Sequence, residues 1–352
     1  MKRIFKKDPT ISVVIATYNA SSTIRLCLES LRKQNYPQEK IEIIIVDGSS
    51  KDETIKIAKM FTHKIFIVEE DKQNAEYNKA VGVSKANGEL LLLLDHDNIL
   101  PHQNWLKNML QPFNKYPEVI AVETLRYHYD KSYSLLDRYF ALFGAGDPLA
   151  YYFGKADRLS FLYDEYNLFG KAKDFGDYYL VKFNKDEIPT LGANGFLIKK
   201  EILVNNAQVS PGKFFHIDVN VDLIRKGFNT YAFIKDSIIH LTSYKSTLQF
   251  LYRRKLFMEQ FYLKELEKEF LGRRYSVYTP KDKFKLIKFI LYSATWVKPT
   301  FDSFRGWIKI RDIAWFLHPF LCFSLLCIYG YTIIKWWLRR LIWVLFGKGE
   351  QF

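Results

Sequence analysis

The residue types best suited to chemistry are two carboxylates one residue apart, in the segment Asp95-His96-Asp97. They follow Leu90 to Leu94, an apolar run that predicts a buried strand ending where the acids begin. Carboxylate oxygens suit hard cations such as Mg²⁺ and Mn²⁺, whose coordination is commonly completed by substrate phosphates. The pattern therefore predicts a divalent-cation site able to neutralise charge on a departing diphosphate. The alternative is structural, with Asp95 capping the next turn and Asp97 solvated.

Two further polar clusters also stand directly after short apolar runs, and they are Thr17-Tyr18-Asn19 and Asp47-Gly48-Ser49. A carboxylate such as Asp47 can accept a hydrogen bond from the ring N–H of a nucleobase. Tyr18 offers an aromatic face on which a base could stack, and Asn19 could orient the loop. The alternative for both clusters is an ordinary strand-to-helix turn, which uses the same residue types.

The elements that carry these clusters alternate between strand and helix patterns. Apolar runs predict strands at 11–16, 41–46, 65–68 and 90–94, with helices between Ser22 and Pro37, at 52–61 and at 75–86. Continuous apolar strands separated by helices indicate a parallel sheet covered on both faces, so the fold class is α/β. Right-handed crossovers place the carboxyl end of every strand on one edge, where ligands bind. We therefore expect the three polar clusters to converge on one cleft.

The remainder of the front region suggests an insertion followed by the end of the domain. Tyr and Phe crowd into residues 126–186, which we expect to form helices and loops over the cleft, as an acceptor platform or a packed lid. Asp147 and Asp157 are possible acceptor contacts there. Strand character returns at 191–199, a helix is expected near 218–226 and a strand at 231–240. Residues 1–245 are thus predicted to form the catalytic domain, followed by a second region at 246–352.

Positive charge is concentrated in that second region. The net charge is +14. Residues 241–352 hold 20 Lys and Arg against 8 Asp and Glu, which leaves 32 against 30 for residues 1–240. Because this basic region is also rich in Trp, Phe, Leu and Ile, we expect it to bind an anionic membrane rather than nucleic acid.

The second region also contains membrane-type segments. Basic amphipathic helices are expected from Thr247 and over about 282–297, before a stretch of 22 residues, 313–334, without Lys, Arg, Asp or Glu. About 20 such residues suffice to span a bilayer. Pro319 and Gly330 could instead bend the stretch into a shallow insertion, and basic residues on both flanks leave the two alternatives open. Because no signal-peptide pattern precedes residue 20, we expect the catalytic domain at the cytoplasmic face of the cell membrane.

Several other classes of protein are disfavoured. No GxGxxG follows the first strand and no GxxxxGK[ST] occurs, which argues against a dinucleotide enzyme and a Walker-type NTPase. Cys27, Cys322 and Cys327 form neither a disulfide framework nor a zinc-spaced set, so we expect a reducing compartment.

Three segments together resemble the N-terminal half of family-2 inverting glycosyltransferases, which have the GT-A fold. They are ISVVIATYN at 11–19, IIIVDGSSKDET at 43–54 and GELLLLLDHDN at 88–98. The segment LGANGFLIKKEIL at 191–203 resembles the strand that shapes the donor and acceptor sites in that family. The resemblance covers about residues 10–245. It implies a Rossmann-like, mostly parallel sheet, a UDP- or GDP-sugar donor, and Mg²⁺ or Mn²⁺ as cofactor.

The same resemblance implies roles for individual residues. Thr17, Tyr18 and Asp47 would bind the nucleotide, and Asn78 would lie near the donor, although Tyr77 stands where many relatives carry Arg. Asp95 would approach the ribose and share the metal with Asp97. His240 ends the last predicted strand, where many relatives place a further metal or diphosphate ligand.

An acceptor hydroxyl needs a base to remove its proton as it attacks the sugar. The resemblance places Asp218 at the family's acidic pair, but Ile217 replaces the second acid, so Asp222 is a rival candidate. Just after the domain, Arg253, Arg254 and Lys255 could bind a polyprenyl phosphate or diphosphate. Their alternative is a basic face on lipid headgroups.

The expected activity is therefore metal-dependent, inverting sugar transfer to a lipid-linked or glycan acceptor, in the assembly of cell-surface polysaccharide or glycoprotein glycans. A bare lipid phosphate would need no base, because it is already an anion. A nucleotidyltransferase on a related α/β sheet and a catalytically degenerate membrane scaffold are the alternatives. A homo-oligomer is compatible with the sequence.

Overall fold

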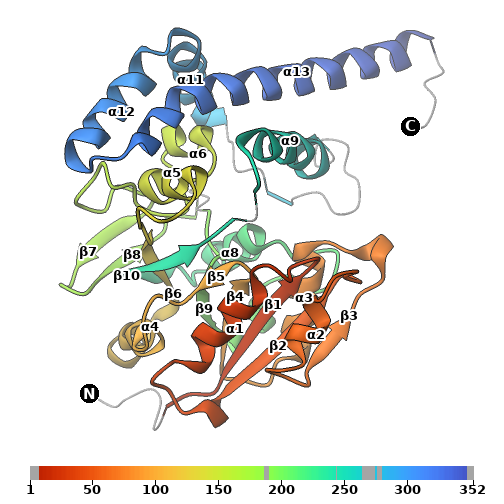
Figure 1. Cartoon of the computed structure of the whole chain (residues 1–352), viewed down its shortest axis with the longest axis vertical. Helices are drawn as coiled ribbons and strands as arrows, with labels where there is room; N and C mark the ends of the chain where they lie inside the picture. Colours follow the sequence, from red (N-terminus) through yellow and green to blue (C-terminus); the bar gives the residue numbers. More distant parts are fainter. Residues whose placement is uncertain (1–7, 186–189, 243, 264–273, 276–279, 347–352) are drawn as a thin grey trace. The chain divides into compact units, whose positions relative to one another are not determined.

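The computed structural model describes residues 8–185, 190–242, 244–263, 274–275 and 280–346. The chain divides into two compact units, which Figure 1 shows coloured along the sequence. Residues 1–146 and 154–243 form the first unit, and residues 147–153 and 244–352 form the second. Sequence analysis places residues 147–153 in the first domain, whereas the structure groups them with the C-terminal helices. The outer ends of both predicted domains, residues 1–7 and 347–352, lie outside the described residues.

The first half of the central sheet is parallel. It consists of β1 (Ile11–Thr17), β2 (Ile41–Asp47), β3 (Ile65–Ile67) and β4 (Leu90–Asp95), in the order β3-β2-β1-β4. Every residue of β1 is buried, as are Leu90 to Leu94 of β4, because both faces of this half are covered. The predicted α/β class and the four predicted strands are confirmed.

The second half of the sheet is mixed and continues in the order β9-β6-β10-β8-β7. Its strands are β6 (Val119–Tyr127), β7 (Lys171–Asp174), β8 (Tyr178–Lys182), β9 (Phe196–Lys199) and β10 (Thr230–His240). β9 runs antiparallel between β4 and β6, and β10 is parallel to β6. The prediction of only helices and loops at 126–186 is wrong here, because β7 and β8 form an antiparallel hairpin that extends the sheet through β10.

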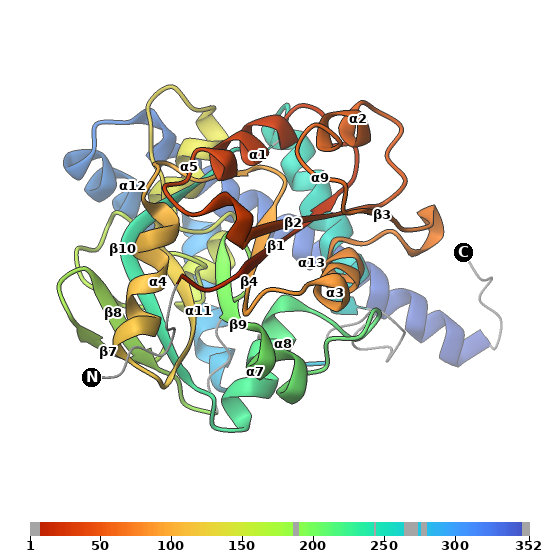
Figure 2. The ribbon, with the colours of Figure 1, turned by 90° about the horizontal axis from the view of Figure 1, so that it is seen from below.

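Helices cover both faces of this sheet (Figure 2). Helices α1 (Ile24–Arg32), α2 (Thr54–Ala58) and α4 (Trp105–Lys115) pack on one face, and α3 (Ala75–Lys85), α7 (Lys200–Asn206) and α8 (His216–Arg225) on the other. The alternation of side chains along β1 divides the two cores, since Val13 and Ile15 face the first group and Val14 the second. Helix α5 (Leu135–Phe143) follows β6.

The register of the parallel strands determines where the polar clusters lie. Thr17 pairs with Asp47 across β1 and β2, and Ala16 pairs with Asp95 across β1 and β4. All three strands therefore end at the same edge of the sheet. The predicted convergence of the three clusters is confirmed.

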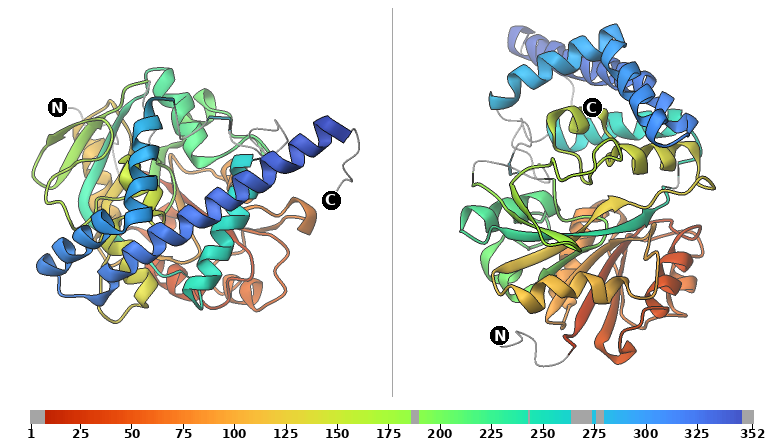
Figure 3. Two further views of the ribbon diagram at one scale, coloured as in Figure 1. Left: turned by 90° about the horizontal axis from the view of Figure 1, so that it is seen from above. Right: turned by 90° about the vertical axis from the view of Figure 1, so that its left-hand side faces the viewer.

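The second unit is helical (Figure 3). It contains α6 (Pro148–Phe153), α9 (Thr247–Phe257), a π-helical turn η3 (Met258–Leu263), η4 (Pro280–Asp282), α11 (Lys283–Thr295), α12 (Val297–Lys309), η5 (Ile313–Phe316) and α13 (Leu317–Phe346). The helices expected from Thr247 and over 282–297 are present, whereas α12 is not among the predicted elements. Within the described residues, 313–342 alone is both long and apolar enough to cross a membrane, by length and composition.

Candidate active site

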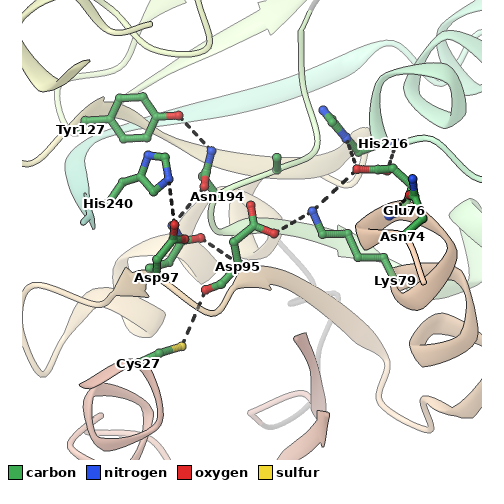
Figure 4. A network of polar contacts seen from close by, with 12 residues as sticks. Cys27, Asn74, Glu76, Lys79, Asp95, Asp97, Tyr127, Asn194, His216 and His240 are labelled. Atoms are coloured by element: carbon green, nitrogen blue, oxygen red, sulfur yellow. Dashed lines mark hydrogen bonds and ion pairs between the residues drawn. The ribbon is translucent and has the colours of Figure 1, made fainter. Parts of the chain in front are cut away.

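A short antiparallel bridge places Asp97 beside His240. Strand β5 (Asn98–Ile99) pairs with the end of β10, with Asn98 opposite His240, and the Leu241 N–H donates to the Asp97 carbonyl at 3.1 Å. The Nε2 atom of His240 consequently lies 3.5 Å from Oδ2 of Asp97 (Figure 4). Two predicted site residues that are far apart in sequence are thus brought together by backbone pairing.

The electrostatics of this pair favour an ionised carboxylate. Burial alone would raise the pKa of Asp97, but His240 outweighs it and lowers that pKa to about 2. Burial opposes protonation of His240, yet Asp97 raises the pKa of the imidazole above its ordinary value. The second oxygen of Asp97, Oδ1, is buried and accepts no hydrogen bond within the described chain. A buried anionic oxygen without a donor is a site at which a cation would be stabilised.

Asp95 has a different partner. The ammonium group of Lys79, on α3, lies 2.8 Å from Oδ1 of Asp95 and 3.9 Å from Oε1 of Glu76. His216, the first residue of α8, donates its backbone N–H to Oε2 of Glu76 at 2.8 Å, and its Nδ1 lies 2.8 Å from Oε1. Figure 4 shows these side chains in one row leading away from the aspartates.

At the centre of the row the oppositely charged Lys79 and Glu76 are buried, whereas the side chains of Asp95 and His216 at its ends are 28% and 19% exposed. The side chain of Lys79 is 3% exposed. Burial disfavours its charged form, but Asp95 and Glu76 outweigh this and raise the pKa of Lys79. Burial likewise opposes ionisation of Glu76, whereas His216 and Lys79 lower its pKa to about 2. Sequence reasoning missed these residues, although the spacing of Glu76 and Lys79 on a predicted helix was a usable signal.

On the side of Asp95 away from Lys79, a chain of hydrogen bonds through Asn98 and Asn194 holds the loop that carries the two aspartates. Asn98 accepts from the Asp95 N–H at 2.9 Å and donates to Asn194 Oδ1 at 3.0 Å. Asn194 in turn donates to the Tyr127 hydroxyl at 2.9 Å. Asn194 has a φ of 56° between Gly192 and Gly195, and such a left-handed conformation is one that Asn tolerates better than most residues. The LGANG motif therefore supports the loop that carries the two aspartates.

A buried ion pair lies behind this network. Arg158 and Glu123 are in contact at 2.7 Å, and Arg158 also donates to the Asn194 carbonyl at 2.8 Å. Next to them, Tyr127 donates to Asp157 at 3.4 Å. Burial raises the pKa of Asp157, and Arg158, His216 and His240 only partly counteract this. Asp157, predicted as an acceptor contact, thus lies within the electrostatic reach of both site histidines.

The candidate nucleotide residues lie at the neighbouring loops. Asp47 is fully buried and accepts from the Thr17 hydroxyl, the Ser50 N–H and the Ser50 hydroxyl, each at 2.7 Å. Asn19 has a φ of 48° and accepts from the Lys51 N–H at 2.9 Å. Tyr18 is 39% exposed. Asp47 therefore holds this loop together, while Tyr18 offers the accessible aromatic face.

Asn78 is fully buried on α3, and both atoms of its amide lack a hydrogen-bond partner within the described chain. Most buried amides in proteins are satisfied, so this one requires an explanation. The residue next to it, Lys79, reaches Asp95.

The two candidate bases differ in their surroundings. Asp218 lies in the first turn of α8 and is 1% exposed, two residues after His216. Asp222 lies one turn further along and accepts from the Gln208 N–H at 3.0 Å. That bond gives Asp222 a role in holding the loop after α7, which weakens the case for it as a base.

The three basic candidates on α9 also differ from one another. Arg254 is ion-paired with Asp147, and it donates to the Tyr329 hydroxyl at 3.1 Å. Lys255 lies 3.7 Å from Glu259, and Arg253 is exposed. Arg254 and Asp147, predicted separately as a phosphate ligand and an acceptor contact, therefore neutralise each other.

The expected metal ligands do not form a closed set. Across the described part of the chain, no group of three or more His, Cys, Asp or Glu side chains is placed to hold an ion. The expected trio of Asp95, Asp97 and His240 stays a prediction, in which Lys79 contacts one oxygen of Asp95 and His240 faces Asp97. The orphan oxygen of Asp97 still fits a cation whose remaining ligands come from a substrate.

Comparison with known proteins gives a match over the segment that contains these loops. Residues 12–175 match the family model described as glycosyl transferase family 2. Glycosyltransferase AglE of Haloferax volcanii is 37% identical over 103 residues, which are 28% of this chain and 34% of that protein. A dolichyl N-acetyl-α-D-glucosaminyl phosphate 3-β-D-2,3-diacetamido-2,3-dideoxy-β-D-glucuronosyltransferase of Methanococcus voltae is 33% identical over 112 residues, 30% of this chain and 34% of its own. The match thus spans about a third of the length of each relative.

Among solved structures, the chain is similar to the mannosyltransferase PcManGT from Pyrobaculum calidifontis in complex with GDP-Man and Mn²⁺. The identity is 15% and the TM-score 0.48, over 94% of this chain and 87% of that one.

Proposed function

We propose that the protein moves a sugar from a nucleotide-diphosphate sugar to a membrane-associated acceptor, because residues 12–175 match the model of glycosyl transferase family 2. The observation that carries the proposal is the buried, partnerless Oδ1 of Asp97 at the edge where β1, β2 and β4 end. Ligands of α/β sheets bind at that edge.

The loops after β1 and β2 would hold the nucleotide of a UDP- or GDP-sugar. Hydrogen bonds from Thr17 and Ser50 hold the Asp47 carboxylate in place, so that the loop after β2 already has a fixed conformation when the base binds. Tyr18 would stack on the base with its exposed ring. Asn78 would supply its unsatisfied amide on the side of the ribose and diphosphate.

Asp97 would hold a Mg²⁺ or Mn²⁺ ion, with Asp95 and His240 beside it. When bound, such an ion neutralises the charge that develops on the departing nucleotide diphosphate. His240 keeps Asp97 ionised, because it lowers the pKa of that carboxyl to about 2. Lys79 holds one oxygen of Asp95 and thereby fixes its rotamer.

A hydroxyl acceptor would require a base, and Asp218 is the residue we assign to this step. Its position in the first turn of α8 lies two residues from His216, which belongs to the row of charges that reaches Asp95. Asp157 is a second carboxylate with a raised pKa near both histidines, a property typical of catalytic bases. Attack from the face opposite the leaving diphosphate would invert the anomeric centre.

The acceptor we propose is a polyprenyl phosphate or a lipid-linked glycan at the cytoplasmic face of the membrane. The Methanococcus voltae relative carries a dolichyl phosphate-linked substrate in its name. The second unit contributes the exposed Arg253 and an apolar helix of membrane-spanning length to this proposal.

The test is nucleotide release from a panel of UDP- and GDP-sugars, with membranes supplied as acceptor. We expect turnover that requires Mn²⁺ or Mg²⁺ and falls by at least about a hundredfold in Asp97→Asn. Asp71→Asn, at an exposed carboxylate on η2 (Glu70–Lys72), is the matched control and should retain activity. Full activity of Asp97→Asn in EDTA would refute the proposed mechanism. Release of pyrophosphate from a nucleoside triphosphate would indicate a nucleotidyltransferase instead.

A further inference from the structure

The burial pattern of helix α12 is the reverse of the one expected for a helix whose outer face contacts water. Its buried positions hold small or polar residues, and they are Pro299, Asp302, Ser303 and Gly306. Its exposed positions hold large apolar side chains, and they are Val297 (73% exposed), Phe301 (62%), Phe304 (52%) and Ile308 (67%). A helix on the surface of a water-soluble protein shows the opposite arrangement.

Specific contacts fix this orientation of α12. Asp302 accepts from the Tyr152 hydroxyl at 3.0 Å and is ion-paired with Lys298. Ser303 donates to the Trp315 carbonyl at 2.8 Å. At Gly306 an added Cβ would overlap the ring of Trp315, so α12 approaches η5 as closely as it can. The polar side is therefore the packed side, and the apolar side is left outside.

The neighbouring helices also expose large apolar side chains. Helices α11, α12 and α13 are in contact with one another (Figure 3). Large apolar side chains on these helices and on η5 are also exposed, including Phe284 (76%), Leu291 (56%), Ile313 (69%), Ile334 (61%) and Trp337 (63%). We call the exposed apolar side chains of α11, α12, η5 and α13 the apolar face. Large amounts of exposed apolar surface mark interaction sites.

The solvent-exposed charged side chains between residues 280 and 342 are all positive. Between residues 280 and 342, all three acids are buried, and they are Asp282, Asp302 and Asp312. Lys and Arg side chains are exposed, including Lys283, Lys288, Arg305, Lys309, Arg311 and Arg339. The partner of this surface should therefore be both apolar and negatively charged.

Aromatic and cationic side chains meet in this region in the way that is typical of a membrane interface. The guanidinium of Arg311 lies 3.7 Å from the centre of the Trp307 ring, and that of Arg340 lies 5.2 Å from Trp336. Trp296 alone joins α11 to α12, with a φ of 63° and 40% of its surface exposed. Trp and Arg are residues that settle at the level of lipid headgroups.

The lengths of α11 and α12 limit how these helices can be placed in a membrane. Helices α11 and α12 have 13 residues each, about 20 Å of helix, whereas spanning a bilayer takes about 20 residues. On α13, Leu321, Cys322 and Leu325 are fully buried against protein rather than facing outward. Neither short helix can therefore span the bilayer, and an interfacial position in the plane of the membrane fits their length.

We propose that the apolar face is a monotopic docking surface for one leaflet of an anionic lipid bilayer, with α12 embedded in the plane of the interface. The proposal specifies how the membrane named under the proposed function is bound, but it is independent of any sugar-transfer step. Its energy would come from burial of apolar side chains together with attraction between Lys or Arg and anionic headgroups.

The test uses the full chain and vesicle flotation, with vesicles of phosphatidylcholine alone or mixed with phosphatidylglycerol. We expect binding to the anionic vesicles, weakened by salt, and at least about tenfold weaker in the double variant Phe301→Glu, Ile308→Glu. The matched control is Met60→Glu, Val204→Glu, two exposed apolar positions of the first unit that lie outside the loops after β1, β2 and β4. It should bind vesicles like the unmodified protein.

Two further measurements separate the outcomes. Titration with UDP and GDP should give the same affinity in both double variants, because neither changes a residue of the nucleotide loops. Equal affinities would show that the first unit is folded in both variants. A loss of vesicle binding could then be told apart from a failure of the sugar-transfer proposal. Unchanged flotation of the α12 variant, or equal loss in the control, would overturn the proposal. Light scattering that shows a dimer converted to a monomer by the α12 changes, with flotation unaffected, would assign the face to a second copy of the chain and overturn it as well.

Discussion

Lys79 donates to Asp95 across 2.8 Å, and the lysine side chain is only 3% exposed. One of the two carboxylates of the Asp95-His96-Asp97 motif thus carries its own buried counter-charge, while one oxygen of Asp97 has no donor among the residues that the structure describes. The two acids are close in sequence but differ in what they can bind. Asp97 is therefore the one that we propose as a cation ligand.

Removing the ammonium group should therefore strengthen cation binding. We expect Lys79→Met to bind Mn²⁺ in the presence of nucleotide diphosphate about tenfold more tightly, because a like charge is removed and Asp95 is freed. Isothermal titration measures this. Lys85→Met, at an exposed lysine on the same helix, should leave the affinity unchanged. An unaltered or weakened affinity in Lys79→Met would show that the lysine does not compete with the ion.

The Glu76 carboxylate should make stability depend on acid pH. Its pKa is lowered to about 2 in the folded protein, so its contribution is fully present above the ordinary pKa of Glu and is lost as pH falls through about 2. We expect Glu76→Gln to lower the free energy of unfolding by about 3 kcal/mol at pH 7. Urea unfolding at several pH values should show this difference shrinking between about pH 4.5 and 2. A difference that stays constant over that range would contradict the assignment.

The amide of Asn78, which has no hydrogen-bond partner among the described residues, should lower the stability of the free protein and contribute to nucleotide binding. A buried polar group without partners costs about 1–3 kcal/mol, so Asn78→Leu should raise the free energy of unfolding by about 1 kcal/mol while weakening UDP or GDP binding. Urea unfolding and calorimetric titration report the two effects separately. The control is Asn74→Leu, which removes the cap that accepts from the Glu76 N–H and should destabilise the protein. Loss of stability in both variants would mean that Asn78 has a structural partner.

Because α12 lies so close to Trp315, a methyl group added at Gly306 should destabilise the protein. Gly306→Ala would place a Cβ inside the indole ring, and we expect it to lower the free energy of unfolding by about 1–3 kcal/mol. Gly330→Ala, in a helix with nothing within 4 Å of the added atom, should instead stabilise by up to about 1 kcal/mol. Thermal unfolding of both variants checks the opposite signs. Equal effects would mean that α12 is not seated on η5.

The parallel half of the fold could be predicted because each strand there is a continuous apolar run with polar residues at its carboxyl end. The family match over residues 12–175 confirms the resemblance read from those runs. The β7–β8 hairpin was missed because all four residues of β7 are exposed and give no apolar pattern. Helix α12 was missed for a related reason, since its polar residues face inward.

At the site, the sequence identified the two aspartates and His240 but not the partners of Asp95. His240 was predicted near Asp97 from the family pattern, and the β5–β10 bridge brings them together. Lys79 and His216 act through contacts made between α3, α8 and the end of β4, and such tertiary contacts leave no local periodicity to read. The pairing of Arg254 with Asp147, separated by 107 positions, was invisible for the same reason.

The Asn98–His240 bridge has a consequence for biosynthesis. The three N-terminal motifs end at residue 98, yet His240, which the β5–β10 pairing places beside Asp97, is synthesised about 140 residues later. A nascent chain, or a truncated product ending before β10, would carry every signature of the family and still lack the histidine that keeps Asp97 ionised. The geometry around Asp97 is thus completed only after β10 has been synthesised and has paired with β5.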